Sequence, residues 1–198
     1  MPERENRNAL ERLAAFSDGV FAVIITIMVL DIRPPHGVGM AAMRPLWPTV
    51  ASYALSFLFT TVAWVNHRQL LMLAERSTRK LTWSNMGFLF TVSLIPFSTA
   101  YMAQERMAPF TVAIEAFVFL LSTIAFVPFE ETVLRECRGD VTGATHEKRA
   151  LLRNALALVL YAAAIPVSYW SGWVSLGMIV TTCLLYFAPE KLRARAAG

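Results

Sequence analysis

Six long apolar segments, separated by short polar stretches, account for most of the chain. Each is close to the ~20 residues that an α-helix needs to cross the hydrocarbon core of a bilayer. The six segments lie at about residues 13–32, 48–67, 83–104, 109–129, 151–170 and 173–189. This pattern predicts an all-α, polytopic membrane protein with six transmembrane helices, and we expect residues 1–198 to form a single transmembrane domain.

Prolines support these segment boundaries. Pro34 follows the first segment, Pro48 opens the second and Pro109 opens the fourth, as expected for a residue that starts helices but does not continue them. Pro96 and Pro166 lie inside predicted helices, where each would free a backbone carbonyl. We expect kinks at these two positions.

Composition agrees with a membrane protein. The chain is 56% hydrophobic, whereas soluble domains are about 45–50% apolar on a count that includes glycine. Its mean hydropathy is +0.49. Charged residues make up only 16% of the chain and cluster between the apolar segments.

The distribution of positive charge predicts the orientation. Fifteen of the 18 Lys and Arg residues lie before the first segment, within 68–80, within 135–153 or after residue 190. The alternate connections hold only Arg33, Arg44 and Arg106. The positive-inside rule then places both termini in the cytoplasm. The short loops and the absence of a targeting signal fit the plasma membrane of a prokaryote. Because the basic residues form no single stripe, we expect contact with membrane lipid and not with nucleic acid.

The sequence contains no glycine-rich phosphate loop, no nucleophile elbow and no Cys/His cluster at metal-ligand spacing. His36, His67 and His146 fall in three different segments. Cys137 lies in a charged connection and Cys183 in the last apolar segment, so we expect no disulfide. The sequence therefore predicts no catalytic residue, no cofactor and no structural metal, and it indicates that the protein is not an enzyme.

Polar side chains from three predicted helices share one depth near the cytoplasmic surface. They are Asp18 of the first helix, Asn66 and His67 of the second, and Ser84 and Asn85 of the third. Two interpretations are open: they face headgroup water, or they form a buried hydrogen-bond cluster that ties the helices together. Trp64, one turn from His67, is placed to cover the cluster and to donate its indole N–H. In either case we expect a structural or gating role.

Four further acidic residues lie near the ends of the apolar segments. They are Glu75, Glu115, Glu130 and Glu131. We expect all four to be exposed or interfacial, because charged groups in a bilayer are costly to bury.

The start of the first helix carries a specific motif. Arg12, three residues, Phe16, Ser17 and Asp18 precede the run GVFAVIITIMVL. This sequence resembles the signature of the transmembrane protein 175 family, which comprises endosomal and lysosomal potassium channels and their prokaryotic relatives. The runs TrpValAsnHis at 64–67 and LeuIleProPhe at 94–97 extend the resemblance.

The resemblance implies a potassium-permeable channel unlike ordinary potassium channels, without a Thr-Val-Gly-Tyr-Gly filter. In that family the first helix lines the pore, and prokaryotic members with a single six-helix repeat form tetramers. The implied assembly is a homotetramer that conducts potassium and other monovalent cations. A secondary transporter or proton-coupled cation carrier is the alternative, although Asp18 lies nearer the cytoplasmic end than a midplane titrating site would.

The resemblance also implies which residues line the pore. The family's narrow apolar constriction falls five residues after the motif aspartate Asp18, on Val23, and further pore positions fall on Thr26 or Ile27 and on Leu30. Helical spacing puts these residues on one stripe. Val23 is smaller than the isoleucine or leucine usual at the tightest ring, so Ile27 and Leu30 are also candidates for the gate.

Two polar residues on this helix have competing interpretations. The Thr26 hydroxyl is either part of a selectivity ring or bonded back to the carbonyl of Ala22. Asp31 either forms an acidic ring at the outer mouth, pairs with Arg33, or faces bulk water.

Overall fold

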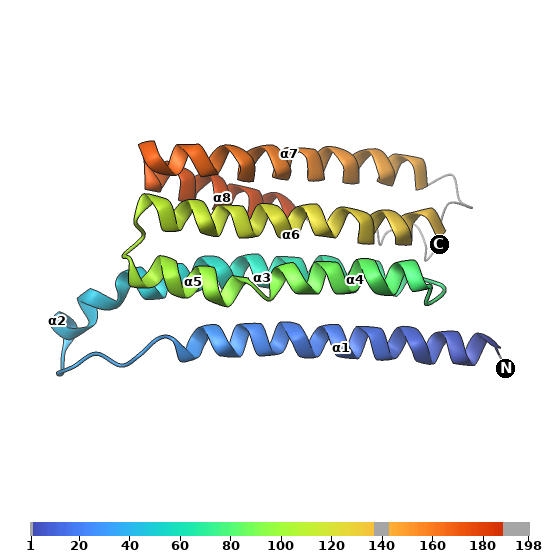
Figure 1. Cartoon of the computed structure of the whole chain (residues 1–198), viewed down its shortest axis with the longest axis horizontal. Coiled ribbons are helices and arrows are strands. Elements are labelled where there is room, and N and C mark those ends of the chain that lie inside the picture. The colour runs from blue at the N-terminus through green and yellow to red at the C-terminus, as the bar shows by residue number, and fades with distance from the viewer. Residues whose placement is uncertain (1, 137–142, 188–198) are drawn as a thin grey trace, which may run out of the picture.

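The structure, a computed structural model, describes residues 2–136 and 143–187. Its elements are α1 (Pro2–Leu30), α2 (Met40–Met43), the 3-10 helix η1 (Arg44–Leu46), α3 (Trp47–Leu73), α4 (Arg79–Val92), α5 (Ile95–Gln104), α6 (Pro109–Glu136), α7 (Gly143–Trp170) and α8 (Gly172–Phe187). The long helices run side by side along one axis (Figure 1).

The prediction of an all-α polytopic membrane protein is confirmed. Within the described residues, five helical segments are long and apolar enough to cross a membrane, and the helix over Gly172–Tyr186 is a shorter apolar sixth. The helices extend beyond the apolar segments, because α1 begins at Pro2, α6 ends at Glu136 and α7 begins at Gly143. These extensions contain Arg, Glu and Lys, which are good helix formers in water as well as in a bundle. Residues 188 and 189 of the sixth predicted segment lie outside the described residues.

The third apolar segment is two helices, not one kinked helix. The helix α4 ends at Val92 and α5 begins at Ile95, so that Pro96 stands in the first turn of α5. Proline is tolerated there because a first-turn residue has no intrahelical N–H bond to lose. The Ser93 hydroxyl, at the break, donates to the carbonyl of Phe90 (2.7 Å). By contrast, α7 continues as one helix through Pro166.

The helix α6 lies at the centre of the packing. It contacts α3, α4, α5, α7 and α8. Its Phe119 is fully buried and stacks on Phe59 of α3 with 3.9 Å between ring centroids. The ring of Tyr161 from α7 meets both phenylalanines edge-on. An aromatic core thus joins α3, α6 and α7.

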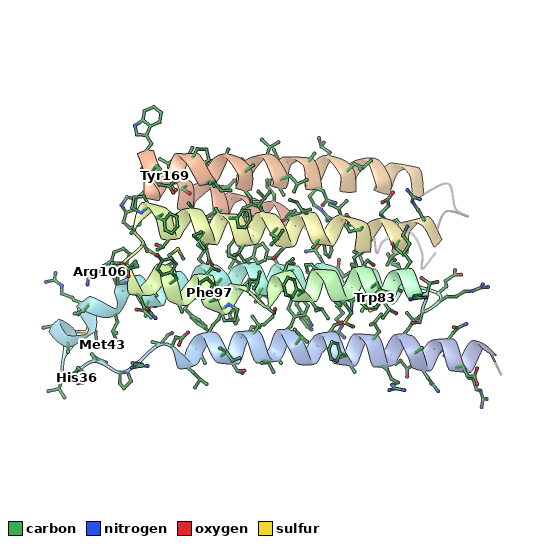
Figure 2. The ribbon with its side chains drawn as sticks, in the orientation of Figure 1. His36, Met43, Trp83, Phe97, Arg106 and Tyr169 are labelled. Carbon is green, nitrogen blue, oxygen red and sulfur yellow. The ribbon has the colours of Figure 1, made fainter. Side chains whose placement is uncertain are left out.

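The helix α1 lies along one side of the bundle (Figure 1). It packs against α3, α5 and α4. The side chains of His36, Met43 and Arg106 lie toward the end of the bundle where α1 finishes, whereas Trp83 lies toward the end where α1 begins (Figure 2). We call these the distal end and the proximal end.

Candidate functional site

The helix α1 presents one face to the rest of the chain. Its buried residues are Leu13, Ser17, Phe21, Ile24 and Met28. Their spacing of three or four residues forms a single stripe along a helix. Packing therefore fixes the rotation of α1 about its own axis, and it also fixes which residues are left on the opposite side.

The three predicted constriction residues lie on the side of α1 that the chain leaves uncovered. Val23 is 54% exposed, Ile27 46% and Leu30 77%. They follow one another at intervals of four and three residues and so form a continuous apolar row. Their role in a pore stays a prediction.

The two polar residues beside this row are also exposed. The Thr26 hydroxyl has the carbonyls of Ala22 and Val23 within reach, both at 3.0 Å, so its single proton bonds to the backbone of its own helix. The side chain itself is exposed on the uncovered side of α1. Asp31 directly follows α1, and in the described part of the chain its carboxylate makes no ion pair with Arg33.

A chain of hydrogen bonds crosses three helices at the proximal end. The Asn85 amide of α4 donates to Ser17 Oγ of α1 (3.1 Å), and Asn85 Oδ1 lies 2.6 Å from His67 Nε2 of α3. All three side chains are buried. With the amide oriented in this way, the imidazole donates through Nε2, which leaves Nδ1 as an acceptor, and Nδ1 has no hydrogen-bond partner.

Aromatic rings surround the histidine of this chain. His67 stacks on Phe129 of α6 with centroids 4.9 Å apart, and its ring also contacts Phe21 of α1 and Phe88 of α4. These rings offer no hydrogen-bonding group to Nδ1. The histidine therefore serves as a buried donor that holds Asn85 in place.

A second bond links α1 and α3 at the same depth. Trp64 Nε1 donates to Asp18 Oδ1 (2.7 Å), and the guanidinium of Arg68 lies 5.5 Å from the Trp64 ring centroid. Asp18 is itself exposed, so this bond lies at the surface of the subunit. The motif aspartate is thereby tied to the second span.

Four residues singled out from the sequence lie apart from these bonds. Ser84 donates to the carbonyl of Leu81 on its own helix (3.0 Å). Asn66 donates to the carbonyl of Val62 on its own helix (2.8 Å). Arg12 and Phe16 are exposed on α1. Of the motif, the structure brings Ser17 and Asp18 into contact with α3 and α4, and it leaves Arg12 and Phe16 on the uncovered side.

The expectation that all four glutamates are exposed or interfacial was wrong for two of them. Glu75 and Glu131 are exposed, and Glu131 pairs with Arg135 one turn later. Glu130, however, is buried, and it accepts hydrogen bonds from Arg153 (2.8 Å) and from Asn154 of α7. A positive partner and an amide compensate its burial.

Glu115 of α6 is the second exception, with none of its surface exposed. Its Oε1 accepts a hydrogen bond from Ser56 of α3 (2.7 Å), and Thr99 Oγ1 of α5 lies 3.5 Å away. The sequence did contain a signal for this: Val112 and Phe119, three residues before and four after, are apolar and fully buried. They place Glu115 on the inward stripe of α6.

The described residues provide no group of three or more His, Cys, Asp or Glu side chains that could hold a metal ion. Cys183 is buried and free, and its sulfur lies 3.6 Å from the Tyr161 hydroxyl. Cys137 lies outside the described residues. The polar groups of the site therefore supply hydrogen bonds between helices.

Comparisons with known proteins identify the family. Residues 12–96 match the family described as endosomal/lysosomal potassium channel TMEM175. A potassium channel from Chamaesiphon minutus is 31% identical, and the match covers 95% of this chain and 98% of that protein. The human endosomal/lysosomal proton channel TMEM175 is 27% identical over 58% of this chain and 23% of its own length.

A solved structure supports the same assignment. The crystal structure of a lysosomal potassium-selective channel TMEM175 homolog from Chamaesiphon minutus matches with a TM-score of 0.75 and 28% sequence identity. The match covers 90% of this chain and 96% of that one. The chain therefore belongs to the TMEM175 family of channels.

Proposed function

We propose that four copies of this chain form a potassium-permeable channel in which α1 lines the pore. The observation that carries the proposal is the asymmetry of α1: one stripe is buried in the chain, and the opposite apolar row of Val23, Ile27 and Leu30 is uncovered. A fourfold arrangement turns this row toward a common axis. Residues 1–198 then act as one six-helix channel domain.

The names of the relatives support potassium as the permeant ion, and the distribution of Lys and Arg supports the orientation in the membrane. The Chamaesiphon minutus relative is named a potassium channel, and the matched structure is described as potassium-selective. We place the protein in a prokaryotic plasma membrane with both termini in the cytoplasm, which the asymmetry of Lys and Arg supports. The permeant species is potassium, and the channel works without a catalytic residue, cofactor or resident metal.

The proposed gate is a stack of apolar rings. At ~1.5 Å rise per residue, the interval from Val23 to Leu30 spans ~10 Å of pore. A narrow apolar throat cannot replace the hydration shell of an ion, so it closes by dewetting. Thr26, which is exposed on the same side of α1, supplies a ring of oxygens for partly dehydrated cations. Asp31 supplies negative charge at the distal mouth, which raises the local cation concentration.

The proximal hydrogen bonds act as the anchor of the pore helix. Bonds from Trp64 to Asp18 and from Asn85 to Ser17 hold α1 to α3 and α4 over about one turn. Interhelical bonds of this kind are worth about 0.6 kcal/mol each in membranes. The gate residues lie one to three turns beyond the anchor, so the apolar part of α1 can move about a fixed end.

Proton permeation is a second candidate activity, because the human relative is named a proton channel. A coupled carrier is the remaining alternative. A channel shows a unitary conductance, whereas a carrier shows saturable exchange. Reversal potentials distinguish the ions, because a potassium-permeable channel follows the potassium gradient and a proton channel follows the pH gradient.

The test uses purified protein reconstituted in lipid bilayers, with single asparagine substitutions at Val23, Ile27 and Leu30. We expect unitary currents that reverse near the potassium equilibrium potential. At least one substitution should raise the open probability or the leak several-fold, because a polar side chain allows the throat to stay wet. Val159→Asn is the matched control, since Val159 is 64% exposed but lies on α7.

Three kinds of outcome contradict the proposal. Currents that do not reverse with the potassium gradient, or that are absent while exchange saturates, exclude a potassium channel. If the three α1 variants conduct as the wild type and the Val159 variant do, the apolar row is not the gate. A chain that is monomeric in lipid by mass photometry excludes a central fourfold pore.

A further inference from the structure

A buried acidic group lies in the distal half of the bundle, away from the proximal anchor. Glu115 stands six residues after the start of α6, is fully buried, and is surrounded by hydroxyl groups from α3 and α5. Ser56 and Thr99 are its hydrogen-bonding neighbours, and the Ser98 hydroxyl also lies beside it. The proposed pore row and its anchor do not use any of these residues.

The positions of the hydroxyl groups suit both charge states of this carboxyl. With the carboxylate ionised, the Ser56 hydroxyl donates to Glu115 Oε1 (2.7 Å) and Thr99 donates to Ser56 Oγ (2.7 Å). With the carboxyl protonated, its own O–H donates to Ser56 Oγ across the same 2.7 Å. Ser56 then donates to the carbonyl of Ser52 (3.0 Å) and Thr99 to that of Ile95 (2.8 Å).

One proton therefore reverses the bond between Glu115 and Ser56 without moving a heavy atom. Adding it turns the Ser56 hydroxyl toward the backbone of α3 and lets the Thr99 hydroxyl donate to the backbone of α5. Removing it makes Ser56 donate to the carboxylate and accept from Thr99. Each state satisfies the hydroxyl protons, as buried polar groups require.

Three buried polar atoms at this carboxyl and on the neighbouring face of α3 lack a hydrogen-bond partner. Glu115 Oε2 is buried without a hydrogen-bond partner, and so are the hydroxyls of Ser52 and Thr60. Ser52, Ser56 and Thr60 follow one another at intervals of one turn on the inward face of α3, about 6 Å apart along the axis. Buried waters in proteins bond to polar groups of this kind where there is room for them.

The site also contacts the proposed pore helix. Thr99 Oγ1 lies 3.7 Å from the sulfur of Met28, and Met28 is a buried residue in the same turn of α1 as Ile27 and Leu30. A change in the direction of the Thr99 hydroxyl therefore takes place against the buried side of the predicted gate.

The other titratable groups of the helices packed against α6 have their own partners or lie elsewhere. His67 bonds to Asn85, Arg153 to Glu130, and Tyr161 lies beside Cys183. Glu105 and Arg106 are exposed in the turn before α6. Among the described residues, the groups that contact Glu115 are hydroxyls, with no cationic side chain within ion-pair distance.

We infer that the Glu115 carboxyl is a proton-binding site inside the subunit and that its protonation, passed through Ser56 and Thr99, controls the pore segment of α1. The first half of this inference is independent of the proposed function. The second half rests on it, because it needs α1 to be the pore helix.

The experiment combines infrared difference spectroscopy with potassium flux on the full chain in lipid vesicles. Spectra taken in acidic and in alkaline buffer should differ by a carboxylic-acid C=O band. Glu115→Gln should remove that band and abolish the dependence of potassium flux on pH. Glu131→Gln, an exposed glutamate of the same helix, should keep both. Ser56→Ala should keep the band but shift its frequency, because the carboxyl loses its shortest hydrogen bond.

Several results would overturn the inference. A C=O band that persists in Glu115→Gln belongs to another group. A band that changes with sodium at constant pH, but not with pH, indicates a metal-cation site instead of a proton site. If the potassium flux of Glu115→Gln depends on pH as that of the wild type does, protonation of Glu115 does not control the gate. If Glu115→Gln does not fold, an unshifted band in Ser56→Ala assigns the band elsewhere. If the wild type carries no potassium flux, the proposed function and the control of the gate fail together, while the infrared spectra still decide the proton site.

Discussion

The helices α1 and α6 are nearly equal in length, at 29 and 28 residues, yet they are held in the structure in different ways. The most apolar window of α6 is 56% buried, and that of α1 is 28% buried. The helix α6 touches α3, α4, α5, α7 and α8, whereas α1 touches α3, α4 and α5 along one stripe. Packing from several sides holds α6, while one stripe and a few hydrogen bonds hold α1.

This difference suggests a division between stability and function. Lipid is as apolar as leucine, so the association of helices in a bilayer depends on packing and hydrogen bonds. Substitutions in the α6 core should therefore unfold the protein. Substitutions at the few polar contacts of α1 should cost less stability but act directly on the position of α1.

The largest expected effect comes from Phe119→Ala in the core of α6. It removes a fully buried ring that stacks on Phe59, and large-to-small changes of this kind cost about 3–5 kcal/mol. Phe117→Ala is the control, because Phe117 lies on the same helix but is exposed, where changes are within about 0.5 kcal/mol. The free energy of unfolding in bicelles measures both. Equal losses of unfolding free energy in Phe119→Ala and Phe117→Ala would contradict the central position of α6.

A smaller effect is expected from Asn85→Ala. This change breaks the chain from Ser17 to His67 and leaves His67 Nε2 unpaired beside an Nδ1 that already lacks a partner. A buried group left unsatisfied costs about 1–3 kcal/mol. Asn66→Ala should cost less, since Asn66 bonds only to its own helix. If the two variants are equally stable in the same unfolding assay, the interhelical chain does not hold α1.

The two asparagines also show how far the sequence could predict the site. It placed Asn66 and Asn85 at the same depth, which follows from counting residues along helices. Only Asn85 turns toward α1, because packing sets the rotation of each helix and an apolar segment with little periodicity does not indicate that rotation. Depth was therefore predictable, and the partner of each polar group was not.

The fold could be predicted to a similar extent. The six apolar segments follow from the hydrophobicity needed to cross a bilayer. The helix ends did not follow, because the polar stretch before Leu13 is helical as well. The burial of Glu115 was missed because a lone acidic residue suggests a surface, and its three hydroxyl neighbours come from α3 and α5, which are distant in sequence. Only the assembled bundle brings them together.

The smallest stability effect, and the sharpest test of the division, is expected from Trp64→Phe. This change keeps an aromatic ring beside Arg68 and removes the N–H that donates to Asp18. Single bonds between membrane helices average about 0.6 kcal/mol, so stability should fall by no more than about 1–2 kcal/mol. The open probability should change clearly, because the bond lies at the fixed end of the helix that carries the gate.

Trp83→Phe is the matched control, since Trp83 is an exposed tryptophan on α4. A double-mutant cycle of Trp64→Phe with Asp18→Asn isolates the bond itself: the two changes should be non-additive in open probability if they remove the same contact. Additive effects, or a Trp64 variant that behaves as the Trp83 variant does, would mean that the buried stripe alone positions α1. In that case α1 would be held as α6 is, by packing, and the polar residues of the motif would need a role other than anchoring.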